Sequence, residues 1–265
     1  MRTKRVLALA GGCLLLTIGA ARAAEPAEPP GYLAPAERPD AARLLGPPPA
    51  PGTGAYAGDA ATYRYTRALK GGPRWTLAVH DADFGAGPMM GAFSCALGVA
   101  LTPRDAPALD RLLSRLAVDT EDDERPAKAA YHRPRPFLAD GGPICVAPED
   151  WLKKSASYPS GHATYSWAAG LVMAEIAPSR AGEIMARARS YGDSRVVCGV
   201  HYETDVQAGR AVGAAVFAAL QANPAFKADL EAARAELVRL RTAPPAALDP
   251  AQCRIEAEAA AHPVW

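Results

Sequence analysis

Prolines and glycines divide the 265-residue chain into runs whose apolar residues recur every three or four positions. That spacing is the period of an α-helix, and proline or glycine at the ends of such a run is typical of helix termini. No segment shows the alternation of apolar and polar residues that a half-buried strand needs. The sequence therefore predicts an all-α fold, a single compact helical bundle domain, with helices near residues 60–70, 73–81, 89–100, 102–128, 160–176, 179–191, 201–220 and 225–241.

The first 23 residues have the pattern of a secretory signal peptide. A basic start precedes an apolar run of about 15 residues, and Ala21-Arg22-Ala23 fits the small-x-small cleavage pattern. The run is shorter than the roughly 20 residues that a membrane-spanning helix needs, and no later stretch is long and apolar enough. We therefore expect an exported protein, periplasmic or secreted, with no membrane segment once the signal is removed.

Composition divides the rest of the chain into three parts. Residues 24–58 are rich in proline, which excludes regular helix and central strand, so we expect them to run extended over the surface. Residues 59–243 carry the helical periodicity and form the predicted domain. Residues 244–265 open on two prolines and are expected to be an irregular tail.

The longest predicted helix should begin at Thr102-Pro103, where a threonine N-cap precedes a proline at the first helical position. Pro126 predicts a break near its end. The acidic run at residues 121–124 is expected to be a solvated face. The buried face is marked by leucines at helical spacing: Leu109, Leu112, Leu113 and Leu116.

The charge balance excludes a general nucleic-acid binder. Loss of the signal segment removes four of the 29 basic residues and leaves 25 against 28 acidic ones, a net charge of about −3. Any affinity for anions must therefore come from a local cluster. Four cysteines remain, which in an exported protein indicates disulfides and permits three pairings; no Cys-x-x-Cys spacing indicates a zinc site.

A turn of small residues, Tyr158-Pro159-Ser160-Gly161-His162, delivers a histidine to the start of an apolar helical run. Ser160 is a good N-cap, and Gly161 lets the backbone approach a ligand closely. A helix N-terminus presents free N–H groups and the positive end of its dipole, which suits phosphate. The stretch indicates an anion cradle with a titratable side chain. Taken alone, it fits more simply a helix cap beside an ordinary surface histidine.

A second motif, Lys128-x6-Arg135-Pro136, brings Lys128, Arg133 and Arg135 close together in the sequence. Guanidinium groups suit oxyanions because their donors form a flat fork, and lysine adds a point charge. By itself the motif also fits a solvated basic face.

The third motif, Ser194-Arg195-x5-His201-x3-Asp205, places a carboxylate one helical turn after a histidine. Asp205 can accept a hydrogen bond from one ring nitrogen of His201 and leave the other free as a nucleophile. Arg195 precedes a glycine, so a bend can direct it to the same anion. Taken alone, the His201–Asp205 pair fits a surface ion pair.

Together the three motifs supply the parts of a phosphoryl-transfer site. Fixed cations and a helix N-terminus can stabilise the charge on a transferring phosphoryl group. One histidine can attack, and the other can protonate the leaving oxygen. Because phosphate monoesters hydrolyse so slowly in water, such a site must lower the barrier by roughly 20 kcal/mol, which requires a preorganised cluster.

In order, spacing and residue types, the three motifs resemble the signature of the acid phosphatase and vanadium haloperoxidase superfamily. The flanking stretches are most similar to the secreted class A bacterial non-specific acid phosphatases. The resemblance covers about residues 30–240, and the stretches most similar to that class lie at residues 67–71, 157–162, 194–199 and 223–226.

The resemblance implies a helical bundle and a mechanism without metal or cofactor. His201 would be the nucleophile that forms a phosphohistidine, Asp205 would orient it, and His162 would be the general acid. The family also implies phosphomonoester substrates (nucleotides, sugar phosphates and aryl phosphates) and a homodimer or larger homo-oligomer in the periplasm. The residues that would hold the phosphate oxygens are Lys128, Arg135, Ser160, Gly161 and Arg195.

Against this background we expect Cys145 to pair with Cys198, because both flank motifs of the site, and Cys95 to pair with Cys253, which would tie the tail to the core. Two other functions remain open. A vanadium-dependent haloperoxidase would hold vanadate with the same cations, and a phosphate-binding protein would hold phosphate without turnover. An integral lipid phosphatase shares the motifs but needs spanning helices, which the sequence does not predict.

Overall fold

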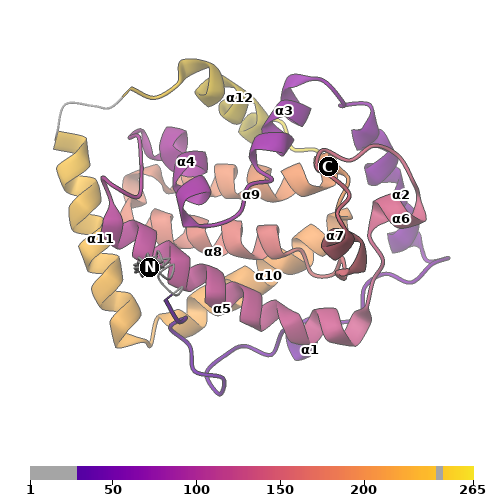
Figure 1. Ribbon diagram of the computed structural model, residues 1–265, viewed down its shortest axis with the longest axis horizontal. Helices are drawn as coiled ribbons and strands as arrows, with labels where there is room; N and C mark the ends of the chain where they lie inside the picture. The colour runs from indigo at the N-terminus through magenta and orange to yellow at the C-terminus, as the bar shows by residue number, and fades with distance from the viewer. Residues whose placement is uncertain (1–28, 243–246) are drawn as a thin grey trace, which may run out of the picture.

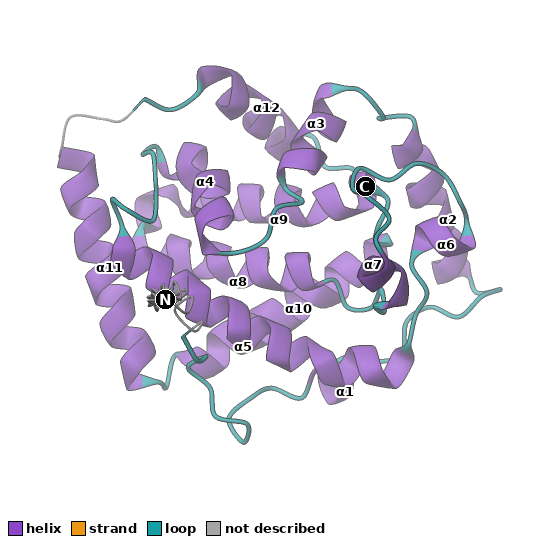
Figure 2. Cartoon of the chain, viewed as in Figure 1, coloured by secondary structure: helices purple, strands orange, loops and turns teal. Residues whose placement is uncertain are grey.

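The computed structural model describes residues 29–242 and 247–265, and the predicted signal peptide lies outside these ranges. The described residues contain helices and no strand, so the predicted all-α fold is confirmed (Figure 2). A short 3-10 helix, Pro178–Arg180, precedes α9. The α-helices are α1 (Ala41–Leu44), α2 (Gly54–Arg67), α3 (Pro73–His80), α4 (Ala86–Leu97), α5 (Pro107–Tyr131), α6 (Pro136–Ala139), α7 (Asp150–Lys154), α8 (Gly161–Ile176), α9 (Ala181–Cys198), α10 (Glu203–Leu220), α11 (Pro224–Thr242) and α12 (Pro250–Ala261).

Helix α8 lies at the centre of the bundle, in contact with α5, α9, α10 and α11 (Figure 1). Buried residues lie on all of its sides, and most of them are apolar, which is the pattern of a helix inside a bundle. Helix α10 approaches α8 closely, because a Cβ atom at Gly209 would lie 2.5 Å from the carbonyl oxygen of Ser160. The start of α8 is therefore held against α10 by direct backbone packing.

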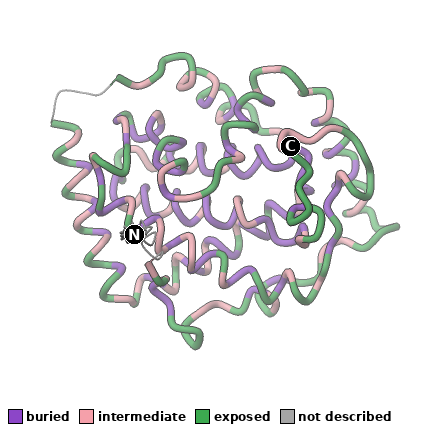
Figure 3. Tube along the Cα trace, viewed as in Figure 1, coloured by how far each residue is buried: buried purple, intermediate pink, exposed green. Residues whose placement is uncertain are grey.

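The hydrophobic core surrounds α8 and extends between its neighbours (Figure 3). The leucine face predicted for the longest helix is buried, and so are aromatic residues from four other helices. Full burial of a leucine or phenylalanine side chain stabilises a fold by about 1.5–3 kcal/mol. The largest apolar members of the core include Phe93, Leu112, Leu113, Tyr165, Tyr191 and Phe226.

Helix α5 differs from its prediction at both ends. It begins at Pro107, because Thr102 caps a preceding turn in which its Oγ1 donates to Asp105 at 2.7 Å. It also continues through Pro126 to Tyr131. A proline inside a helix costs about 3 kcal/mol, and burial of the flanking residues, including Ala127, offsets that cost.

The acidic run at residues 121–124 of α5 was expected to be solvated, but two of its four carboxyl groups are buried. Asp123 and Glu124 are buried, whereas Glu121 is exposed. The leucine face of this helix continues through residues 120, 123, 124 and 127 at the same three- and four-residue spacing, which places both carboxyl groups toward the core.

The structure forms helices in both segments that were expected to lack them, residues 24–58 and 244–265. Helix α2 begins at Gly54, within the proline-rich segment, because Thr53 is an N-cap that accepts from the N–H of Tyr56. The tail predicted to be irregular contains α12, which Asp249 caps and Pro250 begins. In both cases the capping side chain replaces a missing helical partner for the first amides.

Two disulfides hold distant parts of the chain together. Cys145 is joined to Cys198 and Cys95 to Cys253, the two expected pairs. The first fixes the loop after α6 to the end of α9, and the second fixes α12 to α4. Within the described ranges, no helix has the length and apolar character to span a membrane.

Candidate active site

The three sequence motifs converge on one cavity of about 410 Å³ at the N-terminal end of α8. It lies among α5, α7, α8 and the C-terminal end of α9. Ser160 and Asp205 do not line it and are buried behind it. Six of the eight predicted catalytic and phosphate-binding residues line it directly: Lys128, Arg135, Gly161, His162, Arg195 and His201.

The N-terminus of α8 faces this cavity as an anion cradle. Ser160 is the N-cap, with its Oγ 3.4 Å from the amide nitrogen of Ala163. Its own N–H donates to the carbonyl of Asp205 at 2.9 Å, which fixes the turn. The amides of Gly161 and His162, the first two of the helix, have no carbonyl partner within it. They and the helix dipole favour an anion at this position.

Arg195 brings an unneutralised guanidinium group to the cavity. The residue is only 4% exposed, and its Nε and Nη1 atoms are buried with no hydrogen-bond partner in residues 29–242 and 247–265. Burying N–H donors without an acceptor costs about 1–3 kcal/mol for each group, and more when the group is charged. The site is therefore built to gain stability when an anion binds beside Arg195.

Arg135 and Lys128 are held in place mostly by neutral oxygens. Arg135 Nη1 donates to the carbonyl of Val200 at 2.9 Å, and its Nη2 donates to the hydroxyl of Ser155 at 2.9 Å. Lys128 Nζ donates to the carbonyl of Pro159 at 2.7 Å. Carbonyl and hydroxyl partners orient a cation without cancelling its charge, so both heads remain available to an anion.

The pKa values of these cations are lowered by burial and by their proximity to one another. Burial and the nearby charge of Arg195 lower the pKa of Arg135 to about 10. Burial, and to a lesser degree Arg135, lowers the pKa of Lys128, although Glu124 opposes this shift. Positive charges repel one another strongly where water is excluded. A bound dianion would relieve that repulsion.

His201 lies in the short turn before α10, and its partners determine its tautomer. Nδ1 lies 2.8 Å from the carbonyl of Ser157, which can only accept, so Nδ1 carries the proton. Nε2 lies 3.0 Å from Nη1 of Arg135, which can only donate, so Nε2 carries the lone pair. Burial, with Arg135 and Lys128, holds the pKa of His201 well below its usual value. A neutral imidazole whose unprotonated Nε2 lies at the cavity is suited to nucleophilic attack.

Asp205 acts on His201 mainly through Ser157. Its Oδ2 is 3.6 Å from Nδ1 of His201, too long for the direct hydrogen bond that was expected. Instead Oδ2 accepts from the Ser157 hydroxyl at 2.6 Å and from the N–H of Tyr202 at 2.8 Å, and Oδ1 accepts from Arg133 Nη1 at 2.6 Å. The carboxylate therefore holds the residue whose carbonyl orients the imidazole.

His162 projects into the cavity from the first turn of α8. Its Nε2 lies 3.1 Å from the carbonyl of Ala82, so Nε2 carries a proton and Nδ1 is the atom left to gain or lose one. Its ring packs against Phe84, with 4.9 Å between the ring centroids. Burial and the charge of Arg195 hold the pKa of His162 well below its usual value. An anion in the cavity would raise it again.

Arg133 lies in the basic motif with Lys128 and Arg135, but in the structure it pairs with carboxylates and does not line the cavity. Its guanidinium group bridges Asp59 and Asp205, at 2.7 and 2.6 Å. The sequence motifs also did not identify Ser157 as the partner of His201. Ser157 directly precedes the Tyr158 turn, so its position was a signal, but only the fold shows that its carbonyl meets the imidazole.

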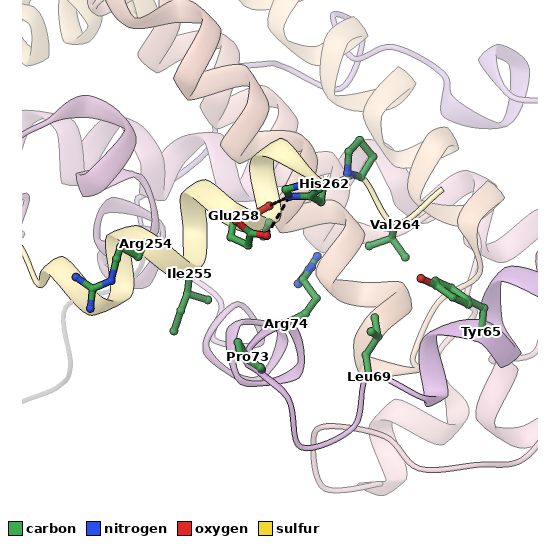
Figure 4. A pocket seen from close by; sticks show the side chains of 11 residues that line it. Tyr65, Leu69, Pro73, Arg74, Arg254, Ile255, Glu258, His262 and Val264 are labelled. Atoms are coloured by element: carbon green, nitrogen blue, oxygen red, sulfur yellow. Dashed lines mark hydrogen bonds and ion pairs between the residues drawn. The ribbon is translucent and has the colours of Figure 1, made fainter.

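Two larger cavities lie elsewhere and lack this chemistry. One, of about 490 Å³, lies between α3 and α12 (Figure 4); its Glu258 and His262 pair with each other, 3.2 Å apart. The other, of about 620 Å³, lies beside the Cys95–Cys253 disulfide. In the part of the chain that the structure describes, no group of three or more His, Cys, Asp or Glu side chains is placed to hold a metal ion.

Comparison with known proteins identifies the family. Residues 113–226 match the PAP2 superfamily. An acid phosphatase of Zymomonas mobilis is 39% identical over 216 residues, which cover 81% of this chain and 81% of the relative. A non-specific acid phosphatase of Providencia stuartii is 39% identical over 212 residues, covering 79% and 86% of the two chains.

A solved structure of a transmembrane PAP2-type phosphatidylglycerolphosphate phosphatase from Bacillus subtilis aligns with 64% of this chain and 87% of its own, with a TM-score of 0.46 and 18% identity. That likeness is too low to carry an argument about the site. The identity and coverage of the curated relatives are decisive. The chain belongs to the PAP2 superfamily and, within it, to the bacterial non-specific acid phosphatases.

Proposed function

We propose that this protein hydrolyses phosphate monoesters through a phosphohistidine formed on Nε2 of His201, without a metal ion. The observation that carries the proposal is the buried guanidinium of Arg195, which lines the cavity with two nitrogen atoms unpartnered among the described residues. Beside it lie two more cations and two histidines. His201 carries its proton on Nδ1 and has Nε2 unprotonated, whereas His162 carries its proton on Nε2 and has Nδ1 unprotonated. An anion at this position completes the hydrogen bonding of the site.

In the first half-reaction, His201 Nε2 attacks the phosphorus atom, the N–P bond forms, and the bond from phosphorus to the leaving oxygen breaks. Nδ1 of His162 gives its proton to that oxygen. Lys128, Arg135, Arg195 and the Gly161 amide stabilise the phosphoryl oxygens. Because a bound dianion opposes the field of these cations, it raises the pKa of His162 and charges the group that must act as the acid.

In the second half-reaction, water attacks the phosphohistidine and gives a proton to Nδ1 of His162. The N–P bond breaks, the lone pair returns to Nε2 of His201, and orthophosphate leaves. Ser157 and Asp205 keep the proton of His201 on Nδ1 throughout, so Nε2 remains the nucleophilic atom.

The rim of the cavity supports a broad choice of leaving group. Trp151 is 63% exposed and Phe84 is 44% exposed, and both line the opening. Exposed aromatic faces can stack on an aryl ring or a nucleobase without specific hydrogen bonds. We therefore propose nucleotides, aryl phosphates and sugar phosphates as substrates.

Export to the periplasm or beyond, and assembly as a homodimer or larger homo-oligomer, remain predictions from the sequence. Two disulfides within one chain are consistent with an oxidising compartment. Size-exclusion chromatography with light scattering on the secreted protein tests the oligomeric state.

The deciding experiment is hydrolysis of p-nitrophenyl phosphate by the purified protein from pH 4 to 9, with and without excess EDTA. We expect activity that survives EDTA and falls by at least about a thousandfold in His201→Ala, as for loss of other nucleophiles. When the reaction with labelled substrate is stopped after a short time without acid, a phosphoenzyme that is labile in acid should be trapped in the unsubstituted protein only. The matched control is His262→Ala, at an exposed histidine directly after α12, which should leave the rate unchanged.

Three outcomes would redirect the assignment. Loss of activity in EDTA would mean that a metal takes part. Halide oxidation on addition of vanadate and peroxide, without ester hydrolysis, would assign a haloperoxidase. Tight phosphate binding by a folded protein with no turnover of any ester would assign a binding protein.

A further inference from the structure

A buried carboxyl group, that of Glu124, lies inside the cation cluster. The residue is 7% exposed, and its Oε1 lies 3.7 Å from Nζ of Lys128. A Cβ atom at Gly161 would lie 2.8 Å from both carboxyl oxygens, so the carboxyl group sits against the first residue of α8. It therefore occupies the edge of the anion cradle, where a phosphoryl oxygen and a carboxylate compete for the same positive surroundings.

The hydrogen bonding of Glu124 is incomplete, in contrast to that of Asp205. Oε2 of Glu124 is buried and has no partner in the described ranges of the chain. Both oxygens of Asp205 accept hydrogen bonds from well-placed donors. A buried carboxylate oxygen without a donor favours the protonated, neutral form. Consistent with this, burial raises the pKa of Glu124 to about 7, although Lys128 opposes the shift.

We propose that Glu124 is a proton gate for the anion site: as a neutral acid it donates a hydrogen bond to an oxygen of the bound phosphoryl group, and as a carboxylate it repels that oxygen and pairs with Lys128. This rests on the proposed function for the identity of the anion. Glu124 thereby becomes a determinant of phosphate affinity that titrates near neutral pH.

The charges around Glu124 set the direction of the effect. In an empty site the nearby cations stabilise the carboxylate. In an occupied site the anion cancels much of their field and adds negative charge beside Oε1, so binding favours the proton. The titratable and charged groups that face Glu124 or share its cavity are Glu121, Arg125 and Lys128 on α5, Arg135 before α6, His162 on α8, Arg195 on α9 and His201 before α10.

Sulfate is the probe for this proposal, because it is tetrahedral and keeps its charge between pH 5 and 9, whereas phosphate changes its own charge in that range. Sulfate affinity is measured by titration calorimetry on the full chain from pH 5.5 to 8.5. If only the protonated carboxyl accepts the anion, affinity falls about tenfold for each pH unit above the pKa of Glu124.

Glu124→Gln is neutral at every pH and keeps an N–H donor. It should bind sulfate within about threefold of the unsubstituted protein at pH 5.5 and at least tenfold more tightly at pH 8.5.

The matched control is Glu121→Gln, one turn earlier on α5, where the side chain is 56% exposed. Because this carboxylate is exposed and pairs with Arg125, its removal should change affinity by the same small factor at every pH. Parallel pH profiles for Glu124→Gln and the unsubstituted protein would overturn the proposal, since the two histidines would then account for all of the pH dependence.

Glu124→Ala keeps the test decisive if the glutamine variant does not fold. It lacks both charge and donor, so it should bind sulfate more tightly than the unsubstituted protein at pH 8.5 and more weakly at pH 5.5. Weaker binding of sulfate at both pH values would contradict the proposed role of Glu124. None of these measurements needs turnover, so the result is independent of whether His201 forms a phosphohistidine.

Discussion

At the scale of single residues, the site separates arginines that look alike in the sequence. Arg133 and Arg135 are two positions apart, yet Arg133 is neutralised by two carboxylates while Arg135 is held by carbonyl and hydroxyl oxygens. Arg195 has buried nitrogen atoms with no partner in the described ranges. Arg133 therefore stabilises the fold, and Arg135 and Arg195 supply charge to the cavity.

This division predicts opposite effects for two substitutions of the same kind. Arg133→Met leaves the carboxylates of Asp59 and Asp205 buried and unpaired, so the free energy of unfolding should fall by about 3–5 kcal/mol. Arg195→Met removes a buried charge that lacks a partner, so stability should stay the same or rise, while phosphate affinity falls at least tenfold. Urea unfolding and phosphate titration measure the two effects. A larger loss of stability for Arg195→Met would contradict the assignment.

A second residue-scale prediction concerns the proposed acid. His162→Gln should lower kcat by about 10²–10⁴-fold for an alkyl phosphate, whose leaving oxygen needs a proton. The loss should be smaller for p-nitrophenyl phosphate, whose leaving group departs as an anion. Steady-state kinetics with both esters on one preparation provide the internal control. Equal losses for the two esters would assign His162 to binding instead.

At the scale of helices, α5 and the contact between α8 and α10 decide where the site forms. The long helix α5 carries Lys128 and Glu124 to the cavity and also buries Asp123, whose two carboxyl oxygens have no partner among the described residues. The close approach of α10 to α8 holds the turn that contains Ser160. Both features show that helix packing, rather than local propensity, positions the groups that line the cavity.

Asp123 predicts a pH dependence of stability. Burial and the charge of Asp119 raise the pKa of Asp123 to about 7. Because the folded pKa is above the unfolded value of about 3.9, the folded state holds the proton more tightly, and stability is lost as pH rises from about 4 to about 7. Asp123→Asn should therefore raise the free energy of unfolding at pH 8 by about 1–3 kcal/mol, and by little at pH 4.

The control for this prediction is Asp122→Asn, which removes a neighbouring carboxylate paired with Arg38 and Arg125. Loss of such partly exposed pairs should lower stability by no more than about 1 kcal/mol. Denaturant unfolding at both pH values compares the variants. If Asp123→Asn destabilises the protein at pH 8, the carboxylate has a stabilising partner that the packing does not reveal.

The helix contact makes a third kind of prediction. Gly209→Ala would place a Cβ atom 2.5 Å from the Ser160 carbonyl, a backbone atom that cannot move without moving the start of α8. We expect a loss of about 1–3 kcal/mol in stability and weaker phosphate binding. Gly91→Ala on α4, where a Cβ atom would meet nothing within 4 Å beyond the adjacent residues and backbone of its own helix, should instead stabilise by up to about 1 kcal/mol. Thermal unfolding of the pair separates the steric effect from helix propensity.

At the scale of the whole molecule, α12 closes the side of the bundle formed by α3 and α9 (Figure 1). The Cys95–Cys253 disulfide anchors it to α4, and Glu256 lies 3.4 Å from Nε of the buried Arg187. Arg187 in turn pairs with Asp81, which accepts from the hydroxyl of Ser194 at 2.6 Å. The C-terminal helix is thus part of the folded body, yet none of its residues lines the catalytic cavity.

Removal of this disulfide should therefore affect stability far more than binding. Replacing Cys95 and Cys253 together by serine should lower the free energy of unfolding by about 2–5 kcal/mol, as expected for a long covalent loop. Sulfate affinity at pH 5.5 should change by less than about twofold. The same replacement of Cys145 and Cys198, which flank the site, is the comparison. A large loss of affinity in the first pair alone would place α12 in the catalytic machinery.

The sequence by itself determined the helical class, the family and six of the fourteen residues that line the cavity. Helical periodicity and the spacing of Pro159, Ser160 and Gly161 are local properties, and they persist wherever the helices pack. The motifs also named His162 and His201 because their chemistry depends on residue type.

Only the tertiary structure decided which charges are neutralised. Three of these outcomes depend on contacts between distant segments. Arg133 pairs with Asp59, Asp205 acts on His201 through Ser157, and Glu124 lies against the anion cradle and not in water. The ends of α2 and α12 likewise depended on capping and on burial against other helices. These outcomes follow from packing energies summed over the whole bundle, which no local stretch of sequence contains.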